Sequence, residues 1–216
     1  DKYLYEKNAG GYRLNTDFKE EKFDFGRMFG FAYGEKENGA VFSHMAVMYA
    51  NALYKRGFIK EGYKVLKNLL DSAMDFENSV MYPGIPEYFD NEGRGLYAYL
   101  TGAASWYMLT MITEVFGVRG EFGNLVIKPA LLPEQFDKEG KAAIKLKFAG
   151  ITLKITIHAD VDNIHHNNGV YDKIIRVECD GNELETADLG KVVIMKKTIE
   201  EMSRKKCHEI EVFIKY

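Results

Sequence analysis

The sequence has few cysteines, no long hydrophobic run and no excess of charge of either sign. Its 216 residues include two cysteines, which are too few for a disulfide scaffold and lack the close spacing of a metal site. The formal net charge of −3 argues against nucleic acid as the main partner, because binding to a phosphate backbone needs a basic excess. No apolar run approaches the roughly 20 residues of a membrane-spanning helix. Since 46% of the residues are hydrophobic, the chain can still bury a sizeable core.

The N-terminal residues carry no targeting signal. The chain begins Asp1-Lys2-Tyr3-Leu4, without an initiator Met or the hydrophobic region of a signal peptide. We therefore expect it to be part of a longer polypeptide, whose upstream portion is one of its partners. Helix faces that lack their neighbours drive association, so we also expect a homo-oligomer where that portion is absent.

The spacing of apolar residues changes near residues 117–123. Before this point they recur at helical spacing, and after it they alternate with polar residues. The first pattern predicts three helices, over about 43–56, 60–74 and 99–116. Ser43 is expected to be the N-cap of the first helix. The connection over 76–97 is long for a structureless loop, which favours a functional role.

Strands are expected in the rest of the chain. Apolar residues alternate over 144–148 and again over 151–157, and the intervening Ala149-Gly150 predicts a hairpin turn. Further strands are expected near 172–179, 190–196 and 209–215. Helices followed by strands indicate two domains, 1–120 and 121–216, rather than alternating βαβ units. The period-2 pattern of the second domain suits a β-sandwich.

Two segments combine small polar groups, a glycine and the start of an apolar helical run. Segment 36–44 is Lys-Glu-Asn-Gly-Ala-Val-Phe-Ser-His, and segment 99–106 is Tyr-Leu-Thr-Gly-Ala-Ala-Ser-Trp. The backbone N–H groups at a helix N-terminus are unpaired, and the helix dipole favours negative charge there. Two such termini, one with a histidine and one with a Thr-Gly pair, can close around a phosphate.

Segments 36–44 and 99–106 resemble, in this order, motifs in the C-terminal part of glycoside hydrolase family 94, which comprises inverting disaccharide and oligosaccharide phosphorylases. The patterns Lys-Glu-Asn-Gly-x-x-Phe-x-His and Leu-Thr-Gly-x-Ala-x-Trp carry the resemblance, which covers at least residues 26–158. The Met-Ala-Val-Met-Tyr that follows His44 departs from cellobiose phosphorylases. It is more similar to the β-1,2-oligoglucan phosphorylase branch, with cellodextrin phosphorylase as second choice.

The resemblance implies both a fold and an activity. The chain would hold the last helices of an (α/α)6 toroid, followed by a C-terminal antiparallel β-sandwich domain. The parent enzyme would cleave a β-linked gluco-oligosaccharide with inorganic phosphate in the cytoplasm, giving α-glucose 1-phosphate with inversion. Phosphate is then a co-substrate, and no metal or organic cofactor is implied; the run 158–166 has metal-ligand residue types without a standard spacing. The family's general acid is an aspartate in a Trp-Asn-Asp-Gly-like motif, which this sequence lacks, so no catalytic residue is expected here.

The resemblance also assigns phosphate-binding residues. His44 matches the histidine that contacts phosphate, and Thr101 and Gly102 match the Thr-Gly pair. An imidazole near a helix start can donate to a phosphate oxygen, and a glycine lets phosphate approach the backbone closely. The residues alone favour a different interpretation, in which His44 is a hydrogen-bonded histidine at a helix entry and the Thr-Gly pair allows close helix packing; the motif match reverses this preference.

Three carboxylates are candidates for binding sugar. Glu37 lies beside the turn-forming Asn38-Gly39 and can accept hydrogen bonds from sugar hydroxyls. Glu87 and Asp90 lie in the long connection and can line a glucan cleft. The alternative for all three is a solvated loop carboxylate. A phosphorylase needs only one catalytic carboxyl, because phosphate is already an anionic nucleophile and no water has to be activated.

Other functions remain open at this point. An inverting glycoside hydrolase fragment would release free glucose without phosphate. A non-catalytic carbohydrate-binding or structural module would bind glucan independently of His44 and Thr101. Within the family, the phosphorylase-like domain of a cyclic β-1,2-glucan synthase would carry the same motifs.

Overall fold

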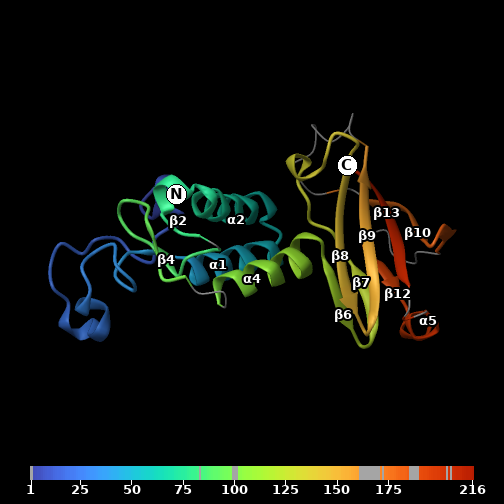
Figure 1. The fold of residues 1–216 in the computed structure, drawn as a ribbon, viewed down its shortest axis with the longest axis horizontal. Coiled ribbons are helices and arrows are strands. Elements are labelled where there is room, and N and C mark those ends of the chain that lie inside the picture. Colours follow the sequence, from blue (N-terminus) through green and yellow to red (C-terminus); the bar gives the residue numbers. More distant parts are fainter. Residues whose placement is uncertain are drawn as a thin grey trace. The chain divides into compact units, whose positions relative to one another are not determined.

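The computed structural model describes residues 2–82, 84–98, 102–160, 171, 173–184, 190–202, 204 and 206–216. They fall into two compact units, which comprise residues 1–110 and 111–216 (Figure 1). This division by compactness falls earlier in the chain than the expected change from domain 1–120 to domain 121–216. The assignment of those two domains stays a prediction.

Helices form most of the regular secondary structure among the described residues of the first unit. The helix α1 (Ser43–Lys55) packs against both α2 (Ile59–Met74) and α4 (Ala103–Thr110), and the short α3 (Phe76–Ser79) follows α2. In α2 the side chains of Val65, Leu66 and Leu69 are buried at helical spacing, which gives the helix one apolar face. The helices predicted over 43–56 and 60–74 are confirmed.

The predicted cap of α1 is wrong. Phe42 occupies the N-cap position and makes no side-chain capping bond, while Ser43 is the first helical residue. The Ser43 Oγ is buried and has no hydrogen-bond partner among the described residues. The Ser43 N–H donates instead to the carbonyl of Glu87 at 2.9 Å, because strand pairing holds the two segments side by side.

Short strands occur in residues 1–42 and in the connection over 76–97, where the apolar spacing predicted neither helix nor strand. A three-stranded antiparallel sheet has the order β3-β4-β5, and a separate hairpin joins β1 to β2. The bounds are β1 Tyr5–Glu6, β2 Gly11–Tyr12, β3 Val41–Phe42, β4 Tyr88–Phe89 and β5 Gly95–Leu96. Two 3₁₀ segments, η1 (Lys7–Ala9) and η2 (Phe23–Gly30), lie between them. The described residues of the connection over 76–97 therefore include regular secondary structure, namely α3, β4 and β5.

The described residues of the second unit form two sheets. The five-stranded sheet has the order β11-β10-β13-β9-β8 and the three-stranded sheet the order β12-β7-β6. The bounds are β6 Val118–Glu121, β7 Asn124–Ile127, β8 Lys141–Phe148, β9 Ile151–Ala159, β10 Lys173–Cys179, β11 Asn182–Glu183, β12 Val192–Ile194 and β13 Cys207–Lys215. The unit also holds the π-helical η3 (Met111–Val115), the 3₁₀ turn η4 (Pro133–Gln135) and α5 (Lys196–Glu201).

The predicted hairpin is confirmed, since β8 and β9 pair antiparallel around Ala149 and Gly150. Both turn residues have positive φ, 47° and 84°, as the two-residue turns favoured in hairpins require. Ile155 of β9 lies between Ile144 of β8 and Ile210 of β13 in the strand register. Ile155 and Ile210 are completely buried and lie at the centre of this core.

The expected fold class is wrong. β13 pairs parallel with β9, from Cys207 opposite Thr152 to Ile214 opposite Ala159, so the five-stranded sheet is mixed. Within the described ranges there is neither an antiparallel sandwich nor a ring of helix pairs of the (α/α)6 type. Alternation of apolar and polar residues fixes which face of a strand is buried, but not the direction of its neighbour. The long connection between β9 and β13 leaves the chain free to return in the same direction.

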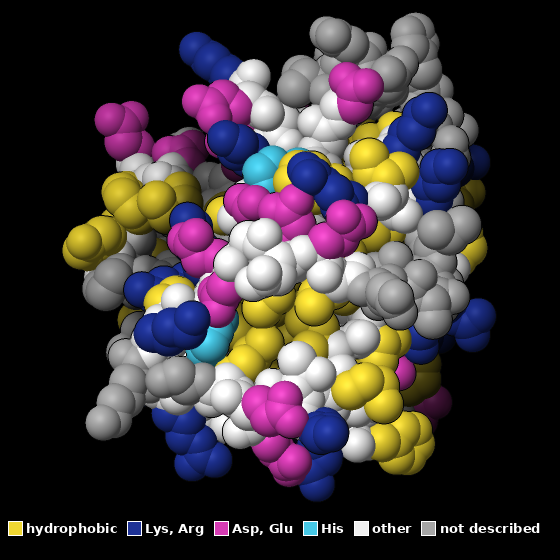
Figure 2. Space-filling view, turned by 90° about the vertical axis from the view of Figure 1, so that its right-hand side faces the viewer, with side chains coloured by type: hydrophobic (Ala, Val, Ile, Leu, Met, Phe, Trp, Pro, Cys, Tyr) yellow, Lys and Arg dark blue, Asp and Glu magenta, His cyan; other side chains and the backbone are white. Residues whose placement is uncertain are grey.

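The surface charge is mixed. On the face that Figure 2 shows, basic and acidic side chains are interspersed around a central area of hydrophobic ones. No helix of the described residues is long and apolar enough to cross a membrane.

Candidate functional site

His44 is the centre of the candidate site. It is the second residue of α1, and its ring is 5.8 Å from the ring of Trp106 on α4. The His44 Nε2 atom is buried and, among the described residues, has no hydrogen-bond partner. An unpaired buried nitrogen costs free energy, so its presence needs an explanation such as a ligand or an ordered water.

The start of α4 lies against the other nitrogen of the same ring. Gly102 directly precedes α4 and has a φ of +68°, which favours glycine. A Cβ at Gly102 would lie 4.0 Å from His44 Nδ1, so the bare backbone of this residue faces the imidazole. Thr101, the third expected phosphate ligand, lies outside the described residues. The structure thus places His44 and Gly102 side by side, at the starts of two helices.

Lys36 supplies a positive charge in the segment that leads into α1. Its Nζ is 3.3 Å from Glu87 Oε2 and 4.0 Å from the centre of the Tyr97 ring. Burial lowers the pKa of Lys36, but the hydrogen bond to Glu87 and the charge of that carboxylate outweigh it, so the pKa is raised overall. Lys36 is therefore cationic at any physiological pH. Glu87 is bound to this lysine and is half-buried, rather than a solvated loop residue.

A second carboxylate holds the neighbouring ring. The Tyr88 hydroxyl donates to Glu35 Oε2 at 2.7 Å, and its ring stacks on Phe42 with centroids 6.2 Å apart. Burial, then the hydrogen bond to Glu35, raise the pKa of Tyr88. Tyr88 therefore stays neutral. It stabilises the pairing of β4 with β3, the strand that directly precedes α1 and His44. Sequence reasoning assigned no role to Tyr88 or Glu35.

Glu37 differs from Glu87 in having one oxygen without a partner. Its Oε1 is 3.3 Å from the Arg27 guanidinium, while its Oε2 is buried and unpaired within the described part of the chain. The following turn depends on Gly39, whose φ is +78° and where a Cβ would meet the Tyr33 ring at 2.2 Å. Glu37 is thus held beside this turn with acceptor capacity left, as a ligand for hydroxyl groups needs.

Asp90 is occupied by its own turn. Its side chain accepts hydrogen bonds from the backbone N–H groups of Glu92 and Arg94, both at 2.9 Å, and from Arg94 Nε at 2.9 Å. The residue is 1% exposed. These contacts give Asp90 a structural role in the 90–94 turn. Its binding to sugar stays a prediction.

Metal binding has no support from the described residues, where no group of three or more His, Cys, Asp and Glu residues is placed to hold an ion. Most of the run 158–166 lies outside them.

Two further residues of the site were present in the sequence motifs, but no function was predicted for them. Lys36 stood in the motif without an assigned role, and so did Trp106, which is half-buried and contacts His44. The i to i+4 spacing of Trp106 from Gly102 was the available signal.

The comparisons with known proteins found a distant relative by sequence. No family model matches the chain. It is 26% identical over 165 residues to the cellobionic acid phosphorylase of Neurospora crassa, a match that covers 70% of this chain and 20% of that enzyme. A family GH92 α-mannosidase from Bacteroides thetaiotaomicron covers 91% of this chain at 14% identity, but the TM-score of 0.27 is too low to support any argument. The chain is therefore distantly similar in sequence to a phosphorylase, and spans a small part of that relative's length.

Proposed function

We propose that this chain forms the phosphate-binding part of an inverting phosphorylase that acts on a β-linked gluco-oligosaccharide. The observation that carries the proposal is His44 Nε2, which is buried without a partner in the described residues and lies beside the start of a second helix. The distant similarity to a phosphorylase supports the same chemistry. The two motifs at 36–44 and 99–106 carry the family resemblance that assigned His44, Thr101 and Gly102 to phosphate binding.

The proposed reaction joins phosphate to the sugar in a single displacement. A phosphate oxygen forms a bond to the anomeric carbon while the bond to the glycosidic oxygen breaks, which gives α-glucose 1-phosphate with inversion. A general acid transfers its proton to the leaving oxygen. We propose that this acid lies outside these 216 residues, because the family's acid motif is missing from them. No metal or organic cofactor takes part in this scheme.

The proposed role of this chain is to position phosphate and to offset its charge. His44 would donate a hydrogen bond from Nε2, and Gly102 would let the anion approach the start of α4, with Thr101 donating its hydroxyl. Holding the anion in line with the anomeric carbon removes much of the entropy cost of the displacement. Glu37, through Oε2, would accept a hydrogen bond from a sugar hydroxyl, and Glu87 would act by holding Lys36.

Phosphate binding can be measured on this chain alone. Trp106 is the single tryptophan and contacts His44, so its fluorescence reports on the imidazole directly. We expect phosphate to change the signal with saturation, and His44→Gln to weaken binding at least about tenfold, the value of one charge-assisted hydrogen bond.

His158 offers a matched control. It too is a half-buried histidine whose Nε2 has no hydrogen bond, but that atom lies 3.5 Å from Glu211 Oε1, where an anion would be repelled. We expect His158→Gln to leave phosphate affinity unchanged. Equal effects of the two substitutions, or no saturable phosphate binding, would contradict the proposed site.

The reaction itself is tested in the synthetic direction. The chain is incubated with α-glucose 1-phosphate and either sophorose or cellobiose, with and without the proposed upstream portion, and released phosphate is measured. Release that depends on the upstream portion supports the proposal, and the better acceptor identifies the linkage. Release by this chain alone would overturn the placement of the acid and make Glu37 and Glu87 the first candidates for it. No release after correct assembly would overturn the phosphorylase itself.

A further inference from the structure

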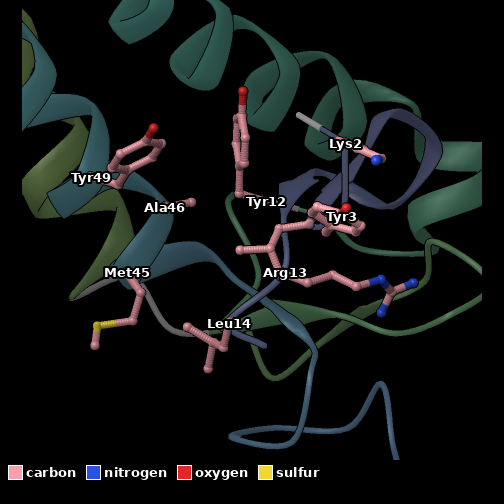
Figure 3. A pocket seen from close by; sticks show the side chains of 9 residues that line it. Lys2, Tyr3, Tyr12, Arg13, Leu14, Met45, Ala46 and Tyr49 are labelled. Atoms are coloured by element: carbon pink, nitrogen blue, oxygen red, sulfur yellow. The ribbon is translucent and has the colours of Figure 1, made fainter. Parts of the chain in front are cut away.

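The first unit contains a pocket that the proposed reaction does not use. It has a volume of about 530 Å³ and lies between α1 and two N-terminal segments, residues 2–4 and 12–14. Figure 3 shows Met45 and Tyr49 projecting from α1 on one side, with Tyr3, Tyr12 and Arg13 on the other. The volume lies within the range of small-molecule sites.

The pocket is separate from His44. Successive residues of a helix are turned by about 100°, so Met45, Ala46 and Tyr49 are centred on nearly the opposite side of α1 from His44. His44 faces Trp106 of α4 and Gly102, which directly precedes α4. The pocket instead faces the part of the chain that is N-terminal to β3. A ligand in the pocket would therefore leave the phosphate site open.

Aromatic rings form the walls of the pocket. Tyr12 and Tyr49 are in edge-to-face contact, with ring centroids 5.4 Å apart and an angle of 71° between the planes. Tyr49 is 46% exposed, which is a large area for an aromatic side chain on a helix. Rings with hydroxyl groups offer an apolar face for the C–H side of a pyranose and polar atoms for its hydroxyls.

The charge of the pocket is positive. Lys2 and Arg13 are the basic residues that line it, and no carboxylate belongs to the lining among the residues that the structure describes. Arg13 is fixed in place by a hydrogen bond from Nη1 to the Gly39 carbonyl at 2.8 Å and lies over the Tyr33 ring. A guanidinium has five N–H donors, and this bond uses one of them. Two cations beside aromatic rings favour a ligand that carries both a sugar face and a negative charge.

We propose that this pocket binds a short gluco-oligosaccharide whose terminal sugar is oxidised to an aldonic acid. The pyranose would lie against Tyr12 and Tyr49, and the carboxylate would pair with Arg13 and Lys2. The choice of a glucose-based acid rests on the proposed function and on the similarity to an enzyme named for cellobionic acid. The pocket, its aromatic walls and its charge stand independently of both.

The test is calorimetric titration of the 216-residue chain with three probes: cellobionate, cellobiose and gluconate. Cellobionate is expected to bind at least about tenfold more tightly than either of the others, because only it offers both the ring and the charge. Tyr49→Ala and Lys2→Gln, both at accessible positions, are expected to weaken it at least about fivefold. Tyr82→Ala, which removes a 76% exposed tyrosine outside the pocket, should change nothing.

The remaining outcomes separate this inference from the proposed function. If His44→Gln abolishes phosphate binding but leaves cellobionate binding intact, the two sites are distinct as proposed. Loss of cellobionate binding in His44→Gln would overturn the pocket and place the sugar at the phosphate site. The proposed ligand of the pocket would also be overturned if cellobiose binds as tightly as cellobionate, or if neither binds. The proposal would also be overturned if the chain self-associates, if Tyr49→Ala removes this association and if sugar has no effect on it. That result would assign this surface to a second copy of the chain.

Discussion

The two units differ in the surroundings of their buried side-chain polar atoms that lack a hydrogen bond. In the first unit, Glu37, Ser43 and His44 each have a buried side-chain atom without a partner in the described residues, and all three fall within one short segment. In the second unit, the corresponding atoms belong to His158 and Arg119, and each side chain lies 3.5 Å from a carboxylate. Unpaired polar groups are costly, so their concentration in the first unit is consistent with the ligand site that we propose there. In the second unit, the two side chains concerned each lie beside a carboxylate of the same unit.

The largest expected effect on stability is in the core of the second unit. Ile155→Ala removes a completely buried side chain between two neighbouring strands and should lower the free energy of unfolding of the second unit by about 2–5 kcal/mol. Urea denaturation followed by far-UV circular dichroism measures this. Ile175→Ala, at a position that is 56% exposed, is the control and should cost less than about 0.5 kcal/mol. Equal effects would mean that the β9 centre is not the core.

The next effect is in the turn that precedes the candidate site. Gly39→Ala forces a φ of +78° on alanine and drives its Cβ into the Tyr33 ring, so we expect a loss of about 1–3 kcal/mol. Trp106 fluorescence during denaturation reports on this unit. Gly57→Ala has a similar φ of +81° with nothing within 4 Å of the new Cβ, and should cost less. A difference in phosphate affinity would further show that the turn positions the site.

The third effect depends on pH and belongs to the second unit. Hydrogen bonds from Lys206, from the backbone of Glu209 and from His208 lower the pKa of Asp180 from 3.8 to about 2. Because the folded value lies below the ordinary one, the stabilisation is complete above about pH 4 and is lost as the pH falls to about 2. Melting temperatures of the wild type and Asp180→Asn should therefore differ at neutral pH and converge near pH 2. A constant difference across that window contradicts the assignment.

The smallest effect tests the comparison directly. Ser43→Ala deletes a buried hydroxyl without a partner, so stability should change by less than about 0.5 kcal/mol or should increase. Ser79→Ala deletes an equally buried hydroxyl that bonds to Ala73 and Met81, and should cost about 1 kcal/mol. Chemical denaturation of the two variants gives both values. A larger cost at Ser43 would mean that an ordered water or ion already satisfies this hydroxyl.

Sequence patterns predicted the parts of this fold that depend on neighbours along the chain. The β8–β9 hairpin and the amphipathic α2 follow from alternation, a two-residue turn and helical spacing, which act over a few residues. The same patterns missed the parallel pairing of β9 with β13 and the strands β3 to β5, since those depend on segments far apart in the sequence. The toroid was expected from the resemblance, and the antiparallel sandwich from the resemblance and the period-2 pattern; both expectations are wrong here. The homo-oligomer stays a prediction.

The candidate site divides in the same way. The sequence by itself determined that a histidine and a glycine lie near the starts of two apolar helical runs, and the resemblance assigned His44 and Gly102 to phosphate. Only the tertiary structure decided that Gly102 faces the His44 ring, that Glu87 is bound to Lys36, and that Asp90 closes its own turn. Whether a polar side chain is free for a ligand depends on what packs against it, and packing joins residues that the sequence keeps far apart.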